Sequence, residues 1–137
     1  IKVFIPSLKS SGDGLWARLT HFYTSPDAGS FFIPEINTQV VVSFINDDPR
    51  QPVILGGLYT KTTKPYTEIT AKNELKAFVS KEKLTLEFDE KDKVIVIKTS
   101  DKNKITISEK EKGEQIEDEN RNEIETSDGG ISISSKD

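Results

Sequence analysis

The stretch that decides the architecture of the second half of the chain is residues 84–107, LTLEFDEKDKVIVIKTSDKNKITI. It contains three short runs of apolar and β-branched residues, at 84–88, 94–97 and 105–107, which start about ten residues apart. The charged segments 89–93 and 100–104 join them, and a fourth run follows at 131–133. β-branched residues favour strands, and a short period of strand plus turn is typical of a solenoid or prism. The repeat therefore predicts an all-β segment.

This repetitive segment has too few apolar side chains to fold as a lone chain. Each repeat offers two or three of them, and each contributes about 1.5–3 kcal/mol when fully buried. Ordering the residues of one repeat costs on the order of 10–15 kcal/mol. Several copies wound around a common axis would give every Ile and Leu an interior neighbour. Disorder is the alternative for the charged stretch 109–125, but the Ile-x-Ile pattern that reappears after it favours strands.

The first half of the chain is built differently, with Gly and Pro dividing residues 1–66 into short runs and no helical periodicity. Strands or short apolar runs are predicted at 1–6, 15–20, 31–33, 39–45 and 53–55, with loops at 10–14, 25–30 and 46–52. Both faces of 39–45 are mostly apolar, which predicts a strand covered on both sides. Short strands without helices favour a small closed or nearly closed barrel of the OB type. We expect a barrel at 1–64, a linker at 65–74 and a repetitive segment at 75–137.

Composition excludes some classes of function. The sequence has no Cys, which rules out disulfides and thiolate metal sites. Its net charge is -4, and residues 67–137 carry thirteen basic and eighteen acidic side chains. Phosphate neutralisation requires a surplus of Lys and Arg, so nucleic acid is not expected as a partner.

No catalytic, cofactor-binding or metal-ligating residue is predicted, and the chain is not expected to be an enzyme. His21 is the only histidine; it falls in a predicted strand with no flanking carboxylate, so a structural role is expected. The adjacent carboxylates of Asp47 and Asp48, and those of residues 117–119, suit turn capping or solvation better than the opposed pair of a glycosidase. Three aspartates near turns are interpreted as solvated, with a calcium ion between chains as the alternative: Asp89, Asp101 and Asp128.

Aromatic residues are concentrated in the first half. They suit a stacking platform on an OB barrel for single-stranded nucleic acid or an oligosaccharide, but only Arg18 and Arg50 lie near them. Core packing and contacts between chains are the simpler interpretation. The residues concerned are Trp16, Phe22, Tyr23, Phe31, Phe32 and Tyr59.

Several blocks of the first half resemble the OB domain of the VgrG family of spike proteins, found in type VI secretion systems, extracellular contractile injection systems and phage baseplates. The blocks are Trp16-Ala17-Arg18-Leu19, Gly29 to Glu35 and Val40 to Tyr59. The second half is similar to that family's β-prism at 73–75, 84–89, 120–124 and 130–134. Family members usually have Gly-Asp or Gly-Glu where this chain has Asn37-Thr38-Gln39. Asn can adopt the left-handed conformation of a Gly, so the fold is expected to survive this departure.

The resemblance implies a homotrimer whose barrel forms a collar and whose intertwined trimeric β-helix forms a needle. It further implies partners: the tube and hub proteins of an injection machine, a tip-capping protein or effectors, and transient contact with a target membrane. Assembly is expected in the bacterial cytoplasm, followed by secretion into a target cell. No His-x-His sequence is present for a metal at the tip, and the short segment 63–72 leaves no room for a lysozyme domain. An OB module that binds oligosaccharide or single-stranded nucleic acid is the alternative function.

Overall fold

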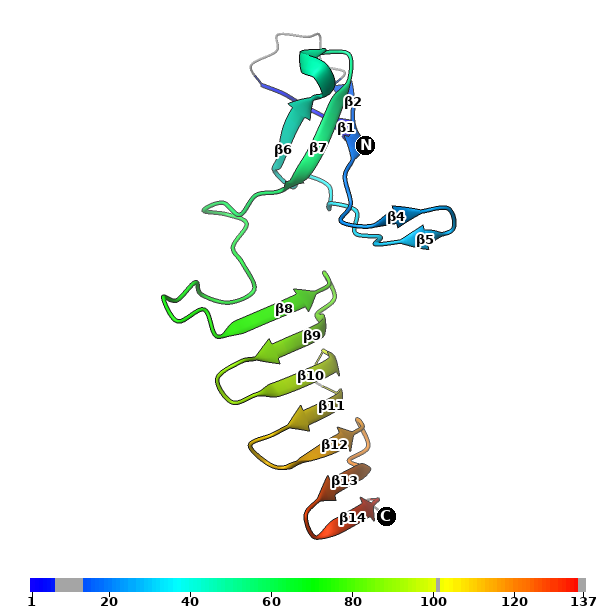
Figure 1. Ribbon diagram of the computed structural model, residues 1–137, viewed down its shortest axis with the longest axis vertical. Coiled ribbons are helices and arrows are strands. Elements are labelled where there is room, and N and C mark those ends of the chain that lie inside the picture. The colour runs from blue at the N-terminus through cyan, green and yellow to red at the C-terminus, as the bar shows by residue number, and fades with distance from the viewer. Residues whose placement is uncertain (7–13, 101, 136–137) are drawn as a thin grey trace. The chain divides into compact units, whose positions relative to one another are not determined.

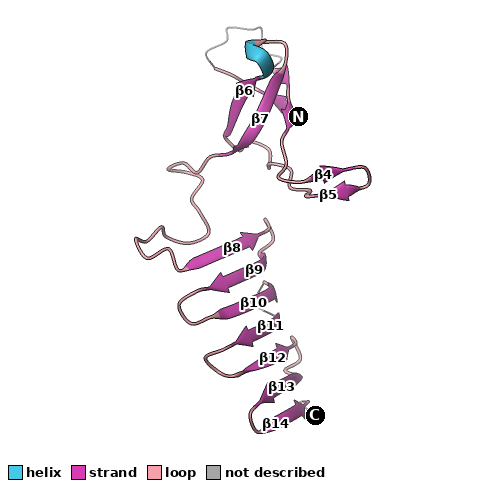
Figure 2. Ribbon diagram, viewed as in Figure 1, coloured by secondary structure: helices cyan, strands magenta, loops and turns pink. Residues whose placement is uncertain are grey.

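The computed structural model describes residues 1–6, 14–100 and 102–135 and divides the chain into two units, residues 1–65 and 66–137 (Figure 1). The predicted all-β class is confirmed, because strands make up both units and the described part of the chain contains only one short 3-10 helix, η1 (Ile45–Asp47) (Figure 2). No helix among the described residues is long and apolar enough to cross a membrane.

Unit 1 consists of three small sheets. One pairs β1 (Lys2–Val3) with β2 (Leu15–Trp16), and another has the order β3 (Arg18–Leu19), β7 (Pro52–Gly57), β6 (Val40–Phe44). The third is the hairpin of β4 (Thr24–Ser25) and β5 (Ala28–Gly29). Within the described residues these sheets do not join into one continuous ladder. The predicted strand 15–20 is split at Ala17, whose N–H donates to the carbonyl of Ile1 rather than to a neighbouring strand.

The core of unit 1 is small. Val3, Ala17 and Ile54 are buried, and Leu15, Leu19, Val40 and Val42 pack partly against them. The prediction that strand 39–45 is covered on both sides is wrong within one chain, because Val41 and Ser43 on its second face are exposed. The described residues of unit 1 provide no second layer on that face.

Two loops of unit 1 differ from the sequence prediction. Residues 25–30, expected as a loop, form the end of the β4–β5 hairpin, in which Asp27 takes the turn at φ 56°. His21 lies between β3 and β4 and not in a strand as predicted. The predicted loop 10–14 lies outside the described residues except for Gly14. Asn37 adopts the left-handed conformation, with φ 68°.

Unit 2 is one antiparallel sheet in which consecutive strands are neighbours, in the order β14 to β8. The strands are β8 (Leu75–Val79), β9 (Leu84–Asp89), β10 (Val94–Thr99), β11 (Asn103–Ser108), β12 (Gly113–Glu117), β13 (Glu123–Ser127) and β14 (Gly130–Ser134). The four predicted runs are the strands β9, β10, β11 and β14. Three strands were not predicted, and two of them, β12 and β13, lie in the charged stretch for which disorder was the alternative.

The turns of unit 2 share a construction. Five of them contain a non-glycine residue with positive φ: Lys83, Lys93, Ser100, Lys112 and Arg121. A side-chain oxygen at the start of the turn accepts backbone N–H donors; for example, Asp89 Oδ1 accepts from the N–H groups of Lys91 and Asp92, both at 3.0 Å. Such side-chain caps replace the ladder bonds that the backbone loses at a turn.

Gly113 allows the β11–β12 turn to approach β13 closely. A Cβ placed on it would lie 1.8 Å from the backbone carbonyl oxygen of Thr126, which cannot move without displacing β13. We expect Gly113→Ala to destabilise the protein by about 2–3 kcal/mol, as overpacking against rigid neighbours does. The measurement is the midpoint of thermal unfolding. The matched control is Gly129→Ala, whose added Cβ would meet only the Ser127 hydroxyl at 3.6 Å; equal effects of the two substitutions would contradict the explanation.

Candidate interaction surface

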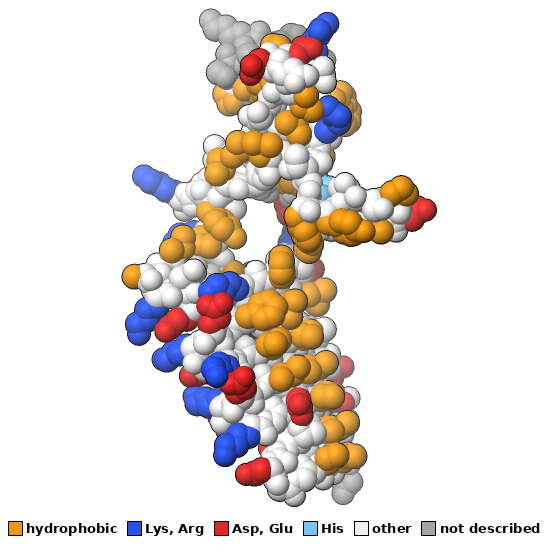
Figure 3. All heavy atoms as spheres, viewed as in Figure 1, with side chains coloured by type: hydrophobic (Ala, Val, Ile, Leu, Met, Phe, Trp, Pro, Cys, Tyr) orange, Lys and Arg blue, Asp and Glu red, His pale blue; other side chains and the backbone are white. Residues whose placement is uncertain are grey.

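One face of the sheet in unit 2 carries a continuous row of apolar side chains, one from every strand. Directly paired residues of antiparallel strands point to the same face, so the strand register defines the row. Its members, from β8 to β14, are Phe78, Leu86, Ile97, Ile105, Ile116, Ile124 and Ile133. We call this set the apolar row. Figure 3 shows hydrophobic side chains gathered along one side of these strands.

The apolar row is exposed to solvent in the single chain. Exposure is highest at the two ends, 56% for Phe78 and 76% for Ile133, and is lowest among the exposed members at Ile105, 39%; Leu86 is half-buried, and no row member is fully buried. A second row on the same face contains Phe88, Ile95, Ile107 and Ile131. A stretch of exposed apolar side chains of this extent marks an interaction surface rather than a solvated one.

The opposite face of the sheet is polar and better shielded. Thr85 and Ser108 are buried at 5% and 6% exposure, and Val94 and Val96 are half-buried. Oppositely charged residues also face each other in the strand register on this face, as do Lys104 and Glu117. The sheet thus leaves its apolar face more exposed than its polar face, the reverse of a sheet that covers its own core.

Ion pairs connect turns that lie on the same side of the sheet, two strands apart. Lys93 Nζ lies 2.7 Å from Glu109 Oε2, and Lys110 Nζ lies 3.1 Å from Asp92 Oδ2. On the other side Lys102 Nζ lies 3.1 Å from Glu119 Oε2. The bonds to Glu109 and Asp92 raise the pKa of Lys93 and of Lys110 respectively. All of these groups are well exposed, so the pairs fix the arrangement of the turns more than they stabilise the fold.

The described carboxylates singled out from the sequence lie on turns or directly beside them; Glu117 and Asp89 are the last residues of β12 and β9, and Asp47 lies in η1. Asp48 Oδ2 lies 2.8 Å from Arg50 Nη2, and this hydrogen bond lowers the pKa of Asp48. Asp118 accepts from the backbone N–H of Asn120 and from that of Asn122, both at 2.8 Å. Asp89 caps its turn, Asp128 lies in the exposed turn before β14, and Asp101 lies outside the described residues. In the described part of the chain, no three or more His, Asp and Glu side chains are grouped so that they could hold a metal ion.

The six aromatic side chains singled out from the sequence are exposed in the single chain, so the expected core packing is wrong for them, whereas the expected contacts between chains stay a prediction. The most exposed are Phe22 at 84%, Phe31 at 82% and Trp16 at 76%. The guanidinium of Arg50 donates to both carboxylate oxygens of Asp48, so it is not available to a phosphate. Exposed aromatics with so little free positive charge fit contact with protein better than contact with nucleic acid.

Three members of the apolar row were missed by sequence reasoning, namely Phe78, Ile116 and Ile124. The signal for the last two is a single Ile flanked by polar residues, in Gln115-Ile116-Glu117 and Glu123-Ile124-Glu125, with turn residues at 118–122 between the two strands. Alternation around one apolar residue is a weak strand signal unless the register to its neighbours is known.

Comparison with known proteins finds a family match within unit 1. Residues 1–59 match the family described as the type VI secretion system/phage-baseplate injector OB domain. Over 71 residues, 48% of this chain, the sequence is 37% identical to the type VI secretion system spike protein VgrG3 of Vibrio cholerae serotype O1. It is 42% identical over 53 residues, 38% of the chain, to the actin cross-linking toxin VgrG1 of the same species. It is 38% identical over 52 residues, 37% of the chain, to the spike protein VgrG1a of Pseudomonas aeruginosa. The matched region covers 7%, 5% and 8% of the lengths of these three proteins.

The turn at Asp118 predicts a specific acid sensitivity. Hydrogen bonds from the backbone and side chain of Asn122 lower the pKa of Asp118 below its usual value of about 3.9. A lowered pKa in the folded state stabilises the protein above the usual value, and this contribution is lost as the pH falls through the lowered one. We expect the wild-type protein to unfold at a higher temperature than Asp118→Ala at neutral pH, and the difference to shrink on acidification to about pH 2.

Thermal unfolding of both proteins across this pH range is the measurement. Asp128→Ala, which removes an exposed aspartate from the next turn of the sheet, is the matched control and should show a smaller change with pH. A stability difference between wild type and Asp118→Ala that stays constant down to pH 2 would contradict the role of the ionised carboxylate.

Proposed function

Because residues 1–59 belong to the injector OB domain family of type VI secretion systems and phage baseplates, and the chain is a relative of the VgrG spike proteins, we propose that it is a structural component of the spike of a contractile injection machine. The observation that carries the proposal is the exposed apolar row of unit 2. A spike needs a long, stiff, self-associating shaft, and this row is the surface on which such a shaft would be assembled.

Copies of the same chain are the partners that fit the apolar row best. The row runs across all seven strands of the sheet, which at about 4.8 Å per strand is a length of roughly 30 Å. A second copy offers a row of equal length and the same spacing, so that every Ile has an apolar neighbour. We propose three copies around one axis, with the apolar rows inside and the charged turns outside. The number three rests on the resemblance to the VgrG family.

This assembly would suit the transmission of force. In unit 2 the backbone hydrogen bonds run from strand to strand, and therefore along the direction in which the sheet is extended. The ion pairs between turns, such as Lys93 with Glu109, lie along the same direction. Both resist displacement of one strand relative to the next, and an interior of branched Ile side chains packs without flexible gaps. In this proposal the shaft delivers the force of contraction to a tip that breaches a target membrane.

The remaining partners and the route follow from the same proposal. The spike would be mounted on tube and hub proteins, carry a tip-capping protein or effectors, and touch the target membrane only transiently. It would assemble in the bacterial cytoplasm and leave the cell when the machine fires. In this role the chain acts mechanically and not as an enzyme. The relatives named as spike proteins support this, whereas the cross-linking activity in the name of one relative belongs to that protein, of which the chain matches 5%.

The proposal predicts that a change on the apolar face dissociates the copies, whereas the same change on the other face does not. Ile97 belongs to the apolar row, and its neighbour Val96 points to the opposite face of β10. We expect the wild-type chain to have the mass of a trimer in solution and Ile97→Ser to weaken association by at least about tenfold, since a buried Ile side chain contributes about 1.5–3 kcal/mol.

Mass measurement by light scattering over a range of concentrations tests this. Val96→Ser is the matched control, because it removes a similar β-branched side chain from the same strand without touching the apolar row. A wild-type chain that is monomeric at micromolar concentration, or equal dissociation by the two substitutions, would count decisively against the proposed shaft.

A further inference from the structure

Residues 22–33 form an apolar arm on unit 1. The arm contains the β4–β5 hairpin, which is held by the pairs Thr24 with Gly29 and Ser25 with Ala28 and by the bond from the Ser30 N–H to the Tyr23 carbonyl at 3.0 Å. It protrudes from the other strands of its unit (Figure 1). An isolated two-stranded hairpin is marginally stable in water, so an arm of this kind requires something to pack against.

The apolar side chains of the arm lie at its base and point into solvent. Phe22 precedes β4 and is 84% exposed; Phe31 follows β5 and is 82% exposed. Tyr23 and Ile33 are also exposed, at 55% and 48%. The four side chains come from the two ends of the hairpin, which the backbone pairing brings together.

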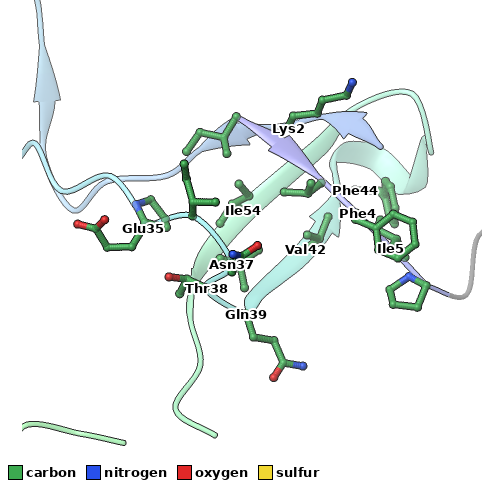
Figure 4. A pocket seen from close by; sticks show the side chains of 16 residues that line it. Lys2, Phe4, Ile5, Glu35, Asn37, Thr38, Gln39, Val42, Phe44 and Ile54 are labelled. Carbon is green, nitrogen blue, oxygen red and sulfur yellow. The ribbon is translucent and has the colours of Figure 1, made fainter. Parts of the chain in front are cut away.

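The same unit contains an apolar hollow of about 790 Å³ (Figure 4). One wall is β1 with the residues after it, including Phe4 and Ile5, and the other is the segment 34–39 with β6. Val42 and the fully buried Ile54 lie at its base. Among the described residues, β6 is the last strand of its sheet and β1 is paired on one side only, so two strand edges border the hollow.

We infer that each copy of the chain inserts its arm into the hollow of the next copy, so that unit 1 has its own interface between copies. This inference rests on the self-association proposed above and names the residues by which the first unit takes part in it. The surface on the arm is Phe22, Tyr23, Phe31 and Ile33; the surface in the hollow is Phe4, Ile5, Val42 and Phe44.

The sizes of the two surfaces agree. An aromatic side chain buries about 150–250 Å² in full, so the arm can remove on the order of 500–800 Å² from water, close to the roughly 800 Å² per partner of a stable interface. The hollow lies within the roughly 300–1,000 Å³ of pockets that enclose a ligand, and so has room for more than one ring.

A second copy is the occupant that this geometry favours. Every copy carries one arm and one hollow, and a contact between two different surfaces of the same chain repeats from copy to copy. It closes into a ring when the rotation between copies closes, as around the common axis proposed above, and otherwise extends into a filament. In such a ring every arm is buried and every hollow is filled. Association through unit 2 also holds the copies together, which raises the effective concentration of arm and hollow for one another.

A double-mutant cycle on the full chain tests the inference. We expect Phe31→Ser on the arm and Phe4→Ser in the hollow each to raise the dissociation constant of the assembly by roughly 10- to 100-fold, as loss of an aromatic anchor does. The double variant should be little worse than either single variant, because the two changes remove the same contact. Tyr59→Ser, which removes a 68% exposed aromatic outside both surfaces, is the matched control and should change the constant by less than about threefold. Circular dichroism of each variant confirms that the strands are retained.

Cross-linking tests the direction of the contact. The chain has no Cys, so two differently tagged single-cysteine versions, Phe31→Cys and Phe4→Cys, can be co-expressed and oxidised. We expect disulfide-linked pairs that contain one of each, roughly tenfold more abundant than pairs formed when Tyr59→Cys replaces either partner. An assembled wild type whose dissociation constant is unaffected by the single substitutions, or is changed additively by them, overturns the arm interface and leaves the shaft proposal standing. A monomeric wild type overturns both.

Discussion

The cross-strand row of apolar side chains is the interaction on which unit 2 depends. Backbone hydrogen bonds between strands are enough to form a sheet, but they do not determine what covers its two faces. The apolar row has one side chain from every strand, from Phe78 to Ile133, so the sheet needs an apolar cover along its whole length. The described residues of one chain form no second layer over this face, and the apolar row is therefore exposed in the single chain. Its cover must be as long and as regular as the sheet itself, which is why a copy of the chain fits better than an unrelated globular partner.

Unit 1 also leaves apolar side chains exposed, but for a different structural reason. Its buried core comprises Val3, Ala17 and Ile54, while many of its aromatic side chains remain exposed. Strands of two residues cannot supply two covered faces, and the short sheets leave edges beside an apolar hollow. Each unit, considered by itself, therefore has apolar surface that a single chain does not bury. In the proposed assembly, association of copies covers the exposed apolar surface of each unit through different residues, so that neither interface alone holds the copies together.

The sequence could predict those elements whose signal is local. β9 and β11 have two or three apolar residues in alternation, and β10 has four in succession; each run lies between charged turns, and this pattern is sufficient. β12 and β13 have one isoleucine each among glutamates, and their place in the sheet is decided by pairing with β11, which is not a local property. The β4–β5 hairpin was read as a loop because Thr, Ser, Ala and Gly give it no apolar alternation. Exposure of the apolar row was foreseeable from the small number of apolar residues per repeat, whereas the arm and the hollow depend on which strand edges remain open.

A polar pair, Glu114 and Thr126, lies on the apolar face and shows how a polar group can be placed there. Glu114 and Thr126 lie between Ile107 and Ile131 in the second row, where a buried carboxylate without partners would be costly. Within the chain, however, the Thr126 hydroxyl donates to Glu114 Oε2 and accepts from the Glu114 N–H at 3.0 Å. A polar group that already has a hydrogen-bond partner within its own chain costs less free energy to bury than an unpaired one. Copies aligned with their strands at equal height would bring these pairs together at one level, whereas a shift by one strand would set Glu114 against an isoleucine or Thr126. The Glu114–Thr126 pair therefore makes the free energy of association depend on how the copies are aligned, which the uniform apolar row by itself does not.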